Sequence, residues 1–237
     1  MISRMRLWKT VRFIGPYLLV SLVLLGFLLV RYGPVDCYSL RPEHQCVCIA
    51  MEGYYAEKRE KQFEEAVNYY TEAINMCPDA PYYYYRRAQL HIRNNDIDSA
   101  LSDFDSALKS SDDTSVFYKY YIGRAELLTV RGEYEKAVPD YQQAHGIFPA
   151  REEPVQALAK ISLDEKDYES AARWYGTLIS LEPENASAYA ERGYAYHMTG
   201  RFADALRDYD RALELMPSLE DVQGLRSLAR DGQMPAG

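Results

Sequence analysis

The sequence has few of the residues from which catalytic sites are built. Its four histidines are scattered along the chain, at His44, His91, His145 and His197. No Ser/His/Asp or Cys/His arrangement recurs at a recognisable spacing, and the sequence has no glycine-rich phosphate-binding loop. We therefore expect a protein that is not an enzyme and that needs no cofactor or metal.

The first 35 residues contain no acidic side chain. Five of the 27 basic residues lie there and all 35 acidic residues follow, so the net charge of −8 conceals an acidic body behind a basic N-terminus. The five are Arg4, Arg6, Lys9, Arg12 and Arg31. Because an acidic surface repels the phosphate backbone, we exclude nucleic acid as a partner.

Only one long stretch lacks charge altogether. Residues 13–30, FIGPYLLVSLVLLGFLLV, are 18 uncharged, mostly apolar residues, and as a helix they reach roughly 27 Å, close to a bilayer core of about 30 Å. By the positive-inside rule, residues 1–12 form a cytoplasmic basic tail and the acidic body lies across the membrane, in a periplasm or lumen. We expect an uncleaved transmembrane anchor. The alternative, a cleaved signal peptide, lacks a small-x-small cleavage site after the run.

Cysteine is confined to the start of the acidic body. The four cysteines are Cys37, Cys46, Cys48 and Cys77, and the last 160 residues have none. An even number of thiols outside the cytoplasm favours two disulfide bonds, which four cysteines can form in three ways. The alternative is a metal or redox site built from His44, Cys46 and Cys48, but it lacks a second ligand pair at zinc-site spacing.

Beyond residue 47 the chain repeats one pattern five times. An alanine recurs at spacings of 34, 37, 34 and 34 residues, and an aromatic residue follows each alanine four positions later. The alanines are Ala66, Ala100, Ala137, Ala171 and Ala205, and the aromatic residues are Tyr70, Phe104, Tyr141, Tyr175 and Tyr209. Twelve positions before the alanine, repeats two to five have a small residue, at Ala88, Ala125, Ala159 and Gly193. Such a period indicates a supersecondary unit that stacks on copies of itself.

The pattern resembles the tetratricopeptide repeat (TPR), and YAERGYAYHMTGRFADALRDYDRALELMP at residues 189–217 is a near-complete copy of that motif. The resemblance implies an all-α fold: about five antiparallel helix pairs over residues 47–217 form a right-handed superhelix. The cysteine-containing residues 31–46 would be a linker. Residues 218–237 would form a capping helix and tail, because Val222, Leu225 and Leu228 make one apolar stripe. The first repeat departs from the pattern, with Tyr54 at the small position.

The implied helix pairs suggest a disulfide pairing. Cys48 and Cys77 begin and end the first antiparallel pair, so both should lie at the same end of it. We therefore predict a Cys48–Cys77 bond, with Cys37–Cys46 as the other.

Comparing the repeats with one another predicts structural ion pairs. Arginine at the seventh position and aspartate at the twenty-third occur together in repeats two, three and five, as Arg87 with Asp103, Arg124 with Asp140 and Arg192 with Asp208. Repeats one and four lack both residues, with Gly53 and Tyr69 in the first and Leu158 and Trp174 in the fourth. Because the two positions change together within each unit, we predict a partly buried, bidentate pair joining the two helices of one repeat.

The family's concave groove is lined by the first helices of the repeats. The residues placed there are Tyr55, Arg59, Tyr82, Tyr85, Arg86, Gln89, Arg93 and Lys119. This basic and aromatic stretch, within an acidic body, suits an extended peptide that carries carboxylates. The lysine and asparagine clamp of the family's chaperone-tail-binding members is absent, so a chaperone C-terminus is not the expected ligand. Tyr84 of the same PYYYYRRA segment is assigned to the core.

Two functions are consistent with these features. The first is a membrane-anchored interaction module that binds a protein or peptide partner at the non-cytoplasmic membrane face. The alternative is a permanent structural or assembly subunit of a membrane protein complex, in which the anchor packs against other transmembrane helices.

Overall fold

A computed structural model describes residues 37–40, 42–59, 63–110 and 117–235 of the 237-residue chain. The predicted basic tail, residues 1–12, and the predicted anchor, residues 13–30, lie outside these ranges. Within them, no helix combines the length and the apolar composition that crossing a membrane requires.

The described residues form one short 3-10 helix, Cys37–Ser39, then eleven α-helices, and no strand. The helices are α3 (Pro42–Lys58), α4 (Phe63–Met76), α5 (Pro81–Arg93), α6 (Ile97–Lys109), α7 (Tyr118–Val130), α8 (Tyr134–Ile147), α9 (Glu152–Asp164), α10 (Tyr168–Leu181), α11 (Ala186–Met198), α12 (Phe202–Leu215) and α13 (Glu220–Arg230). The first helix begins at Pro42, inside the segment that the sequence analysis assigned to a linker.

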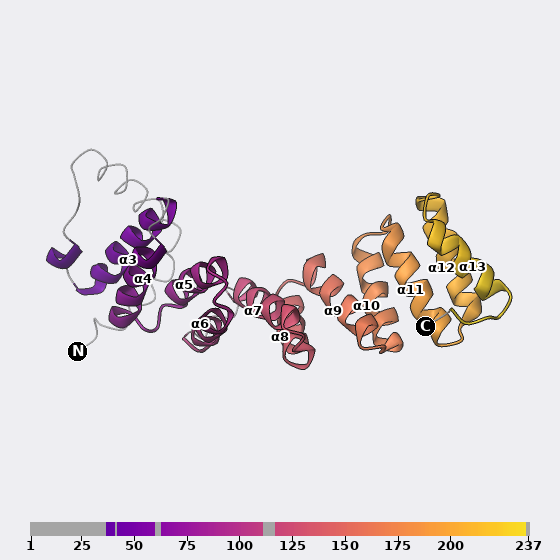
Figure 1. The fold of residues 1–237 in the computed structure, drawn as a ribbon, viewed down its shortest axis with the longest axis horizontal. Coiled ribbons are helices and arrows are strands. Elements are labelled where there is room, and N and C mark those ends of the chain that lie inside the picture. The colour runs from indigo at the N-terminus through magenta and orange to yellow at the C-terminus, as the bar shows by residue number, and fades with distance from the viewer. Residues whose placement is uncertain (1–36, 41, 60–62, 111–116, 236–237) are drawn as a thin grey trace, which may run out of the picture.

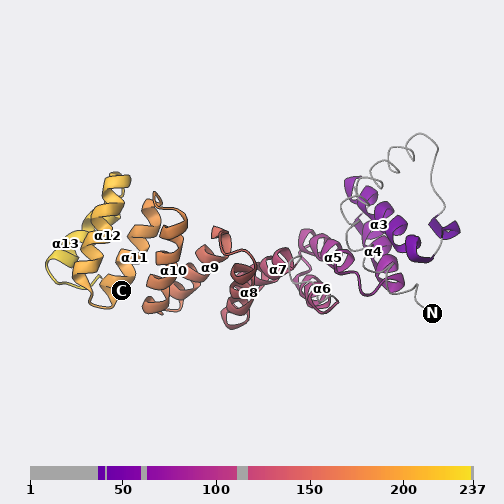
Figure 2. The same ribbon diagram turned by 180° about the vertical axis from the view of Figure 1, so that it is seen from behind.

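The helices stack in chain order into one elongated array, which both ribbon views show from the indigo to the yellow end (Figure 1, Figure 2). Each helix packs mainly against its neighbours in the sequence, and α13 packs on α12 and α11. Helices α3, α5, α7, α9 and α11 are the first helices of the five repeats, and α4, α6, α8, α10 and α12 are the second. The fold is therefore the predicted all-α repeat array with a capping helix.

The turn between the two helices of a repeat has a recurring geometry. In repeats two to five one residue of this turn has a left-handed backbone, with φ of 59° at Asn95, 74° at Gly132, 61° at Lys166 and 76° at Gly200. The next N–H donates to the carbonyl five residues earlier, as from Asp167 to Ser162 at 2.8 Å. This is the Schellman arrangement, and it satisfies carbonyls that the end of a helix would leave unpaired.

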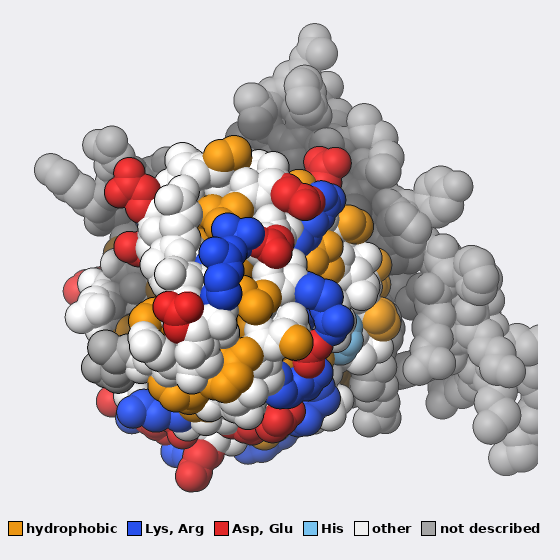
Figure 3. All heavy atoms as spheres, turned by 90° about the vertical axis from the view of Figure 1, so that its right-hand side faces the viewer, with side chains coloured by type: hydrophobic (Ala, Val, Ile, Leu, Met, Phe, Trp, Pro, Cys, Tyr) orange, Lys and Arg blue, Asp and Glu red, His pale blue; other side chains and the backbone are white. Residues whose placement is uncertain are grey.

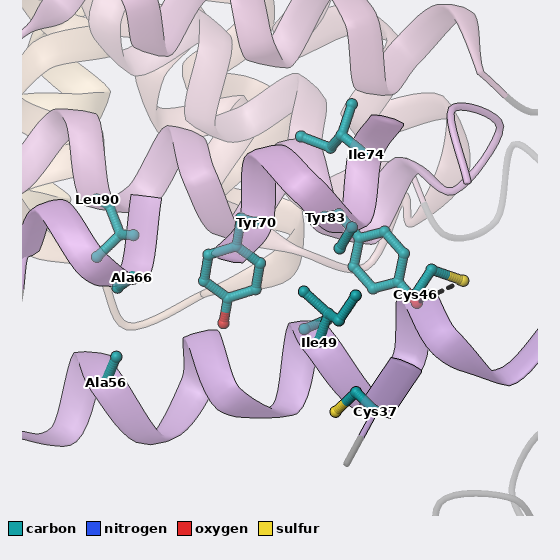
Figure 4. Packing of buried hydrophobic residues seen from close by; sticks show 11 residues of the cluster. Cys37, Cys46, Ile49, Ala56, Ala66, Tyr70, Ile74, Tyr83 and Leu90 are labelled. Carbon is teal, nitrogen blue, oxygen red and sulfur yellow. Dashed lines mark hydrogen bonds between the residues drawn. The ribbon is translucent and has the colours of Figure 1, made fainter. Parts of the chain in front are cut away.

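The core consists of the residues that define the repeat. All five pattern alanines are fully buried, and the five aromatic residues are at most 7% exposed. Figure 4 shows the core of the first repeat, where Tyr70 lies near Ile49 of α3 and Leu90 of α5. Tyr83 reaches from α5 to Cys46, with its hydroxyl 3.8 Å from the sulfur, so neighbouring repeats share this core.

The first repeat is offset by one residue from the sequence prediction. A β-carbon on Gly53 would lie 3.3 Å from the Tyr70 ring, as one on Gly193 would lie 2.9 Å from the Tyr209 ring, so Gly53 takes the small position. Tyr54 is instead 41% exposed. The prediction counted back twelve residues from the pattern alanine. It missed that α3 ends five residues before α4 begins, whereas α5 ends four before α6 begins.

All four cysteines form disulfide bonds, but the predicted pairing is wrong. The bonds are Cys37–Cys48 and Cys46–Cys77, with Cα atoms 5.5 and 6.1 Å apart. Because α3 already begins at Pro42, Cys46 and Cys48 are helical residues about 200° apart around the axis. Cys46 faces the core and meets the end of α4, while Cys48 faces the 3-10 helix. Because Cys46 and Cys48 are each bonded to another cysteine, neither offers a free thiolate as a metal ligand.

The three predicted ion pairs are confirmed. In each, Nε and Nη2 of the arginine donate to the two carboxylate oxygens of the aspartate, at 2.9 and 2.6 Å for Arg87–Asp103, 2.7 and 2.7 Å for Arg124–Asp140, and 2.7 and 2.8 Å for Arg192–Asp208. The aspartates are at most 6% exposed, so each pair is a partly buried link between the two helices of one repeat.

The third nitrogen of the same arginines reaches the preceding repeat. Nη1 of Arg87 donates to the Thr71 hydroxyl at 2.9 Å, and Nη1 of Arg124 donates to Asp105 at 2.6 Å. At the equivalent place before Arg192 stands Gly176, which has no side chain to accept a bond. Arg87 and Arg124 therefore each join three helices, a link that the comparison within single repeats could not reveal.

The C-terminal end is closed by α13 and by the residues after it. His197 of α11 is fully buried, with Nδ1 3.2 Å from the Tyr209 hydroxyl and Nε2 2.7 Å from the Gln233 carbonyl. Because a carbonyl only accepts, Nε2 carries the proton and holds the tail in place. Figure 3, viewed from this end, shows basic and acidic side chains interspersed with hydrophobic ones.

Candidate binding groove

The candidate site lies on the first helices of the repeats. In α5 it comprises Tyr82, Tyr85, Arg86, Gln89, Ile92 and Arg93, five of which the sequence analysis assigned to the groove. Counting from the small residue of each repeat gives the equivalent positions in α3, α7, α9 and α11. We call these positions the groove face.

The offset in the first repeat changes which residues of α3 belong to this face. With Gly53 at the small position, Tyr54 and Lys58 replace the predicted Tyr55 and Arg59, and Glu57 joins them.

Arg86 is the centre of the groove face in the first two repeats. Its Nη1 donates to the Tyr82 hydroxyl at 3.1 Å, and its Nη2 donates to Oε2 of Glu57. The guanidinium carbon lies 5.3 Å from the ring centroid of Tyr54, 5.8 Å from that of Tyr82 and 6.0 Å from that of Tyr70. Three rings and one carboxylate from α3, α4 and α5 thus surround a single cation.

Glu57 lowers the positive charge that this region offers to a partner. Its side chain is only 8% exposed, so it neutralises the charge of Arg86 from the buried side of the guanidinium. Its Oε1 and the Tyr70 hydroxyl are buried, and neither makes a hydrogen bond of good geometry. Burial raises the pKa of Tyr70, so the phenol stays protonated and a small rotation would let it donate to the carboxylate.

The other predicted residues differ in how far they are available. Tyr82 is 49% exposed. Tyr85 is half-buried, with its ring centroid 5.1 Å from that of Tyr120 and 6.2 Å from that of Phe104, so it is at least partly scaffold. Gln89 is half-buried, whereas Arg93 and Lys119 are exposed. Their part in binding stays a prediction.

After the first turn of α7, the groove face becomes acidic. It carries Glu126 in α7, Glu153 in α9 and Glu191 in α11, and none of the three forms an ion pair with another described residue. The Tyr118 hydroxyl donates to Glu153 at 2.8 Å. Burial raises the pKa of Glu126, and the nearby Glu153 carboxylate raises it further.

Sequence reasoning missed Tyr54, Glu57 and this acidic half. Tyr54 and Glu57 could have been found by allowing for the longer connection after α3. The acidic half could have been found by extending the groove positions to repeats four and five. Within the described ranges, no group of His, Cys, Asp and Glu side chains is arranged to hold a metal ion.

Protein-family comparison agrees with the geometry. Models of a family described as Tetratricopeptide repeat match residues 51–114, 85–152 and 158–230. Among curated proteins, the chain is similar to a TPR repeat-containing protein of Methanocaldococcus jannaschii, 26% identical over 188 residues, covering 74% of this chain and 27% of that protein. It is also similar to DnaJ homolog subfamily C member 7 of Homo sapiens, 28% identical over 182 residues, covering 69% and 36%. The chain thus spans about a third of these relatives or less.

Two solved structures share the fold. One is YrrB, described as a TPR protein with an unusual peptide-binding site, with 16% identity and a TM-score of 0.64, covering 83% of this chain and 100% of that one. The other is the MamA protein, with 17% identity and a TM-score of 0.61, covering 73% and 92%. At these identities the similarity concerns the arrangement of helices alone.

Proposed function

Because this chain belongs to the tetratricopeptide-repeat family, it is a protein–protein interaction module, and we propose that it holds a partner's segment on its groove face beside a membrane. The proposal places the repeats on the non-cytoplasmic side, tethered by residues 13–30.

The binding proposal rests on Tyr54 and Tyr82. They are 41% and 49% exposed and flank Arg86, which is itself fixed by Glu57. Tyrosine and arginine are the residue types most enriched at interface hot spots, and side chains held before binding lose little entropy on binding. The solved structure of a relative in fold, YrrB, carries a peptide-binding site by its own description, which supports a peptide ligand here.

The location is supported by sequence and by covalent structure together. The apolar run and the basic residues before it favour an anchor with a cytoplasmic N-terminus. Disulfide bonds are typical of oxidising compartments, so the two bonds here favour repeats outside the cytoplasm.

The test is affinity capture with the full-length chain from membranes solubilised in mild detergent. Tyr54→Ala with Tyr82→Ala should lower recovery of the native partner at least about tenfold, the loss expected when hot-spot side chains are removed. The control is Met76→Ala with Met216→Ala, which removes two residues that are 38% and 44% exposed outside the groove face. If both double variants recover the partner equally well, the groove face does not bind it.

The alternative, a permanent subunit, predicts a different result in the same extract. Size-exclusion chromatography would then give one stoichiometric complex that survives dilution. A recruiting module should instead dissociate from its partner and exchange it.

A further inference from the structure

The charges on the groove face are separated along the array. In α3, α5 and the first turn of α7, cations outnumber carboxylates, and Lys58, Arg93 and Lys119 are exposed without an ion pair to any described residue. In the remainder of α7 and in α9 and α11, carboxylates outnumber cations. On the groove face of these helices the cation is Lys160, and the carboxylates are Glu126, Glu153, Asp164 and Glu191.

The carboxylates of the groove face differ from those on the second helices. On the outer helices, many carboxylates have an arginine or lysine partner, as in Asp98–Arg131, Asp204–Arg201 and Glu214–Arg211. Glu126, Glu153 and Glu191 have none among the described residues. This contrast indicates that the outer helices neutralise part of their charge internally, whereas these three groove carboxylates remain available to another molecule.

The acidic half also carries small residues beside its carboxylates. On the groove face these are Ala157 in α9 and Ala190 in α11, and both are half-buried. Tyr118 fixes the Glu153 carboxylate, so one acceptor is oriented before binding. The acidic half also adjoins the aromatic one, because Glu126 interacts electrostatically with Tyr85.

From this arrangement we propose that the groove takes one extended peptide whose charge changes sign along its length. Its acidic or aromatic part lies on α3 and α5, and its lysine- or arginine-rich part lies on α7, α9 and α11. This deepens the proposed function and rests on it. Complementary charge fixes the register of such a peptide and speeds its association more than it adds affinity.

The ionised groove carboxylates destabilise the fold of the unbound protein. Burial raises the pKa of Glu126 and of Glu191, although both residues are partly open to solvent, because their ionised forms lose water, and neither forms an ion pair with a described residue. An acid whose pKa is raised on folding destabilises the fold above that pKa, and the penalty disappears below its ordinary value. Neutral variants should therefore be more stable near pH 7, with no gain at acidic pH.

The first experiment measures the binding of labelled synthetic peptides to the full-length chain in detergent by fluorescence anisotropy. Peptides of about 15 residues, roughly 50 Å when extended, carry an aromatic acidic block followed by a basic block, in either chain direction. One of these should bind at least about tenfold more tightly than a scrambled peptide of equal composition, and the difference should shrink as salt rises. Equal affinities would overturn the charge order while leaving peptide binding intact, whereas no binding by any peptide would count against the proposed function too.

The second experiment separates recognition from folding. Glu126→Gln with Glu191→Gln should weaken the two-block peptide about tenfold while raising the melting temperature at pH 7. Glu64→Gln with Glu135→Gln makes the same charge change on outer helices, at exposed residues, and should leave peptide affinity unchanged. Loss of affinity in both double variants would mean that overall charge, and not the groove face, attracts the peptide.

Discussion

Gly123 controls a contact between two repeats because it lacks a side chain. It lies in α7 against Phe104 of the preceding repeat, and a β-carbon there would be 2.5 Å from Cζ of that ring. Phe104 is fully buried and packs against Tyr85, so the ring has little room to move.

Gly123→Ala should therefore lower the free energy of unfolding, although alanine is the better helix former. Overpacking costs about 1–3 kcal/mol, against a gain of about 1 kcal/mol from helix propensity. Gly146→Ala in α8 is the matched control, because nothing lies within 4 Å of its β-carbon, and it should be stabilising. Urea unfolding checks both, and a stabilised Gly123→Ala variant would show that the Phe104 ring moves aside freely.

At the scale of helices, two of the turns have a residue other than glycine at the left-handed position: Asn95, a residue type that tolerates this conformation, and Lys166. Lys166 adopts φ of 61° where repeats three and five have Gly132 and Gly200. A side chain in this region costs about 1–2 kcal/mol, whereas glycine adopts it freely but loses more entropy on folding.

Lys166→Gly should accordingly raise the free energy of unfolding by about 0.5–1 kcal/mol. Lys160→Gly, in the interior of α9, should lower it by about 1 kcal/mol. Chemical denaturation of the two variants measures both changes in the free energy of unfolding. Destabilisation by both would mean that the turn holds lysine without strain.

The ion pairs bind helices together in the same way at three places. Replacing either Arg124 or Asp140 alone leaves a partly buried charge, so each single change should cost up to about 3–5 kcal/mol. Arg124→Leu with Asp140→Trp, the pair of residues found in repeat four, should cost less than the sum. A double-mutant cycle from denaturant unfolding measures the coupling, and additive effects would contradict the interaction.

At the scale of the whole molecule, the disulfide bonds reinforce one end. Mass spectrometry of protein isolated without reductant should find Cys37–Cys48 and Cys46–Cys77 and no free thiol. In the chain-entropy account, the bond with a sequence separation of 31 adds about 3.5 kcal/mol to the first repeat, so Cys46→Ser with Cys77→Ser should destabilise more than Cys37→Ser with Cys48→Ser. Four free thiols would contradict an oxidising compartment.

Sequence reasoning succeeded where the chain repeats itself. The core alanines and aromatic residues, and the pairing of Arg124 with Asp140, followed from comparing one repeat with another. It failed in the first repeat, where one extra residue after α3 moved the small position to Gly53. The contact of Glu57 with Arg86 was missed for the same reason, and the early start of α3 at Pro42 redirected Cys46 towards Cys77.

The two ends of the array differ in how they are fastened. Covalent bonds close the first repeat, whereas the last is closed by α13 and by the hydrogen bond from His197 to the Gln233 carbonyl. Since each helix depends mainly on its neighbours, local opening should begin at the C-terminal end and travel inward. Amide hydrogen exchange should then be fastest in α13 and α12 and slow progressively towards α3, which gives the array an intrinsic direction of fraying.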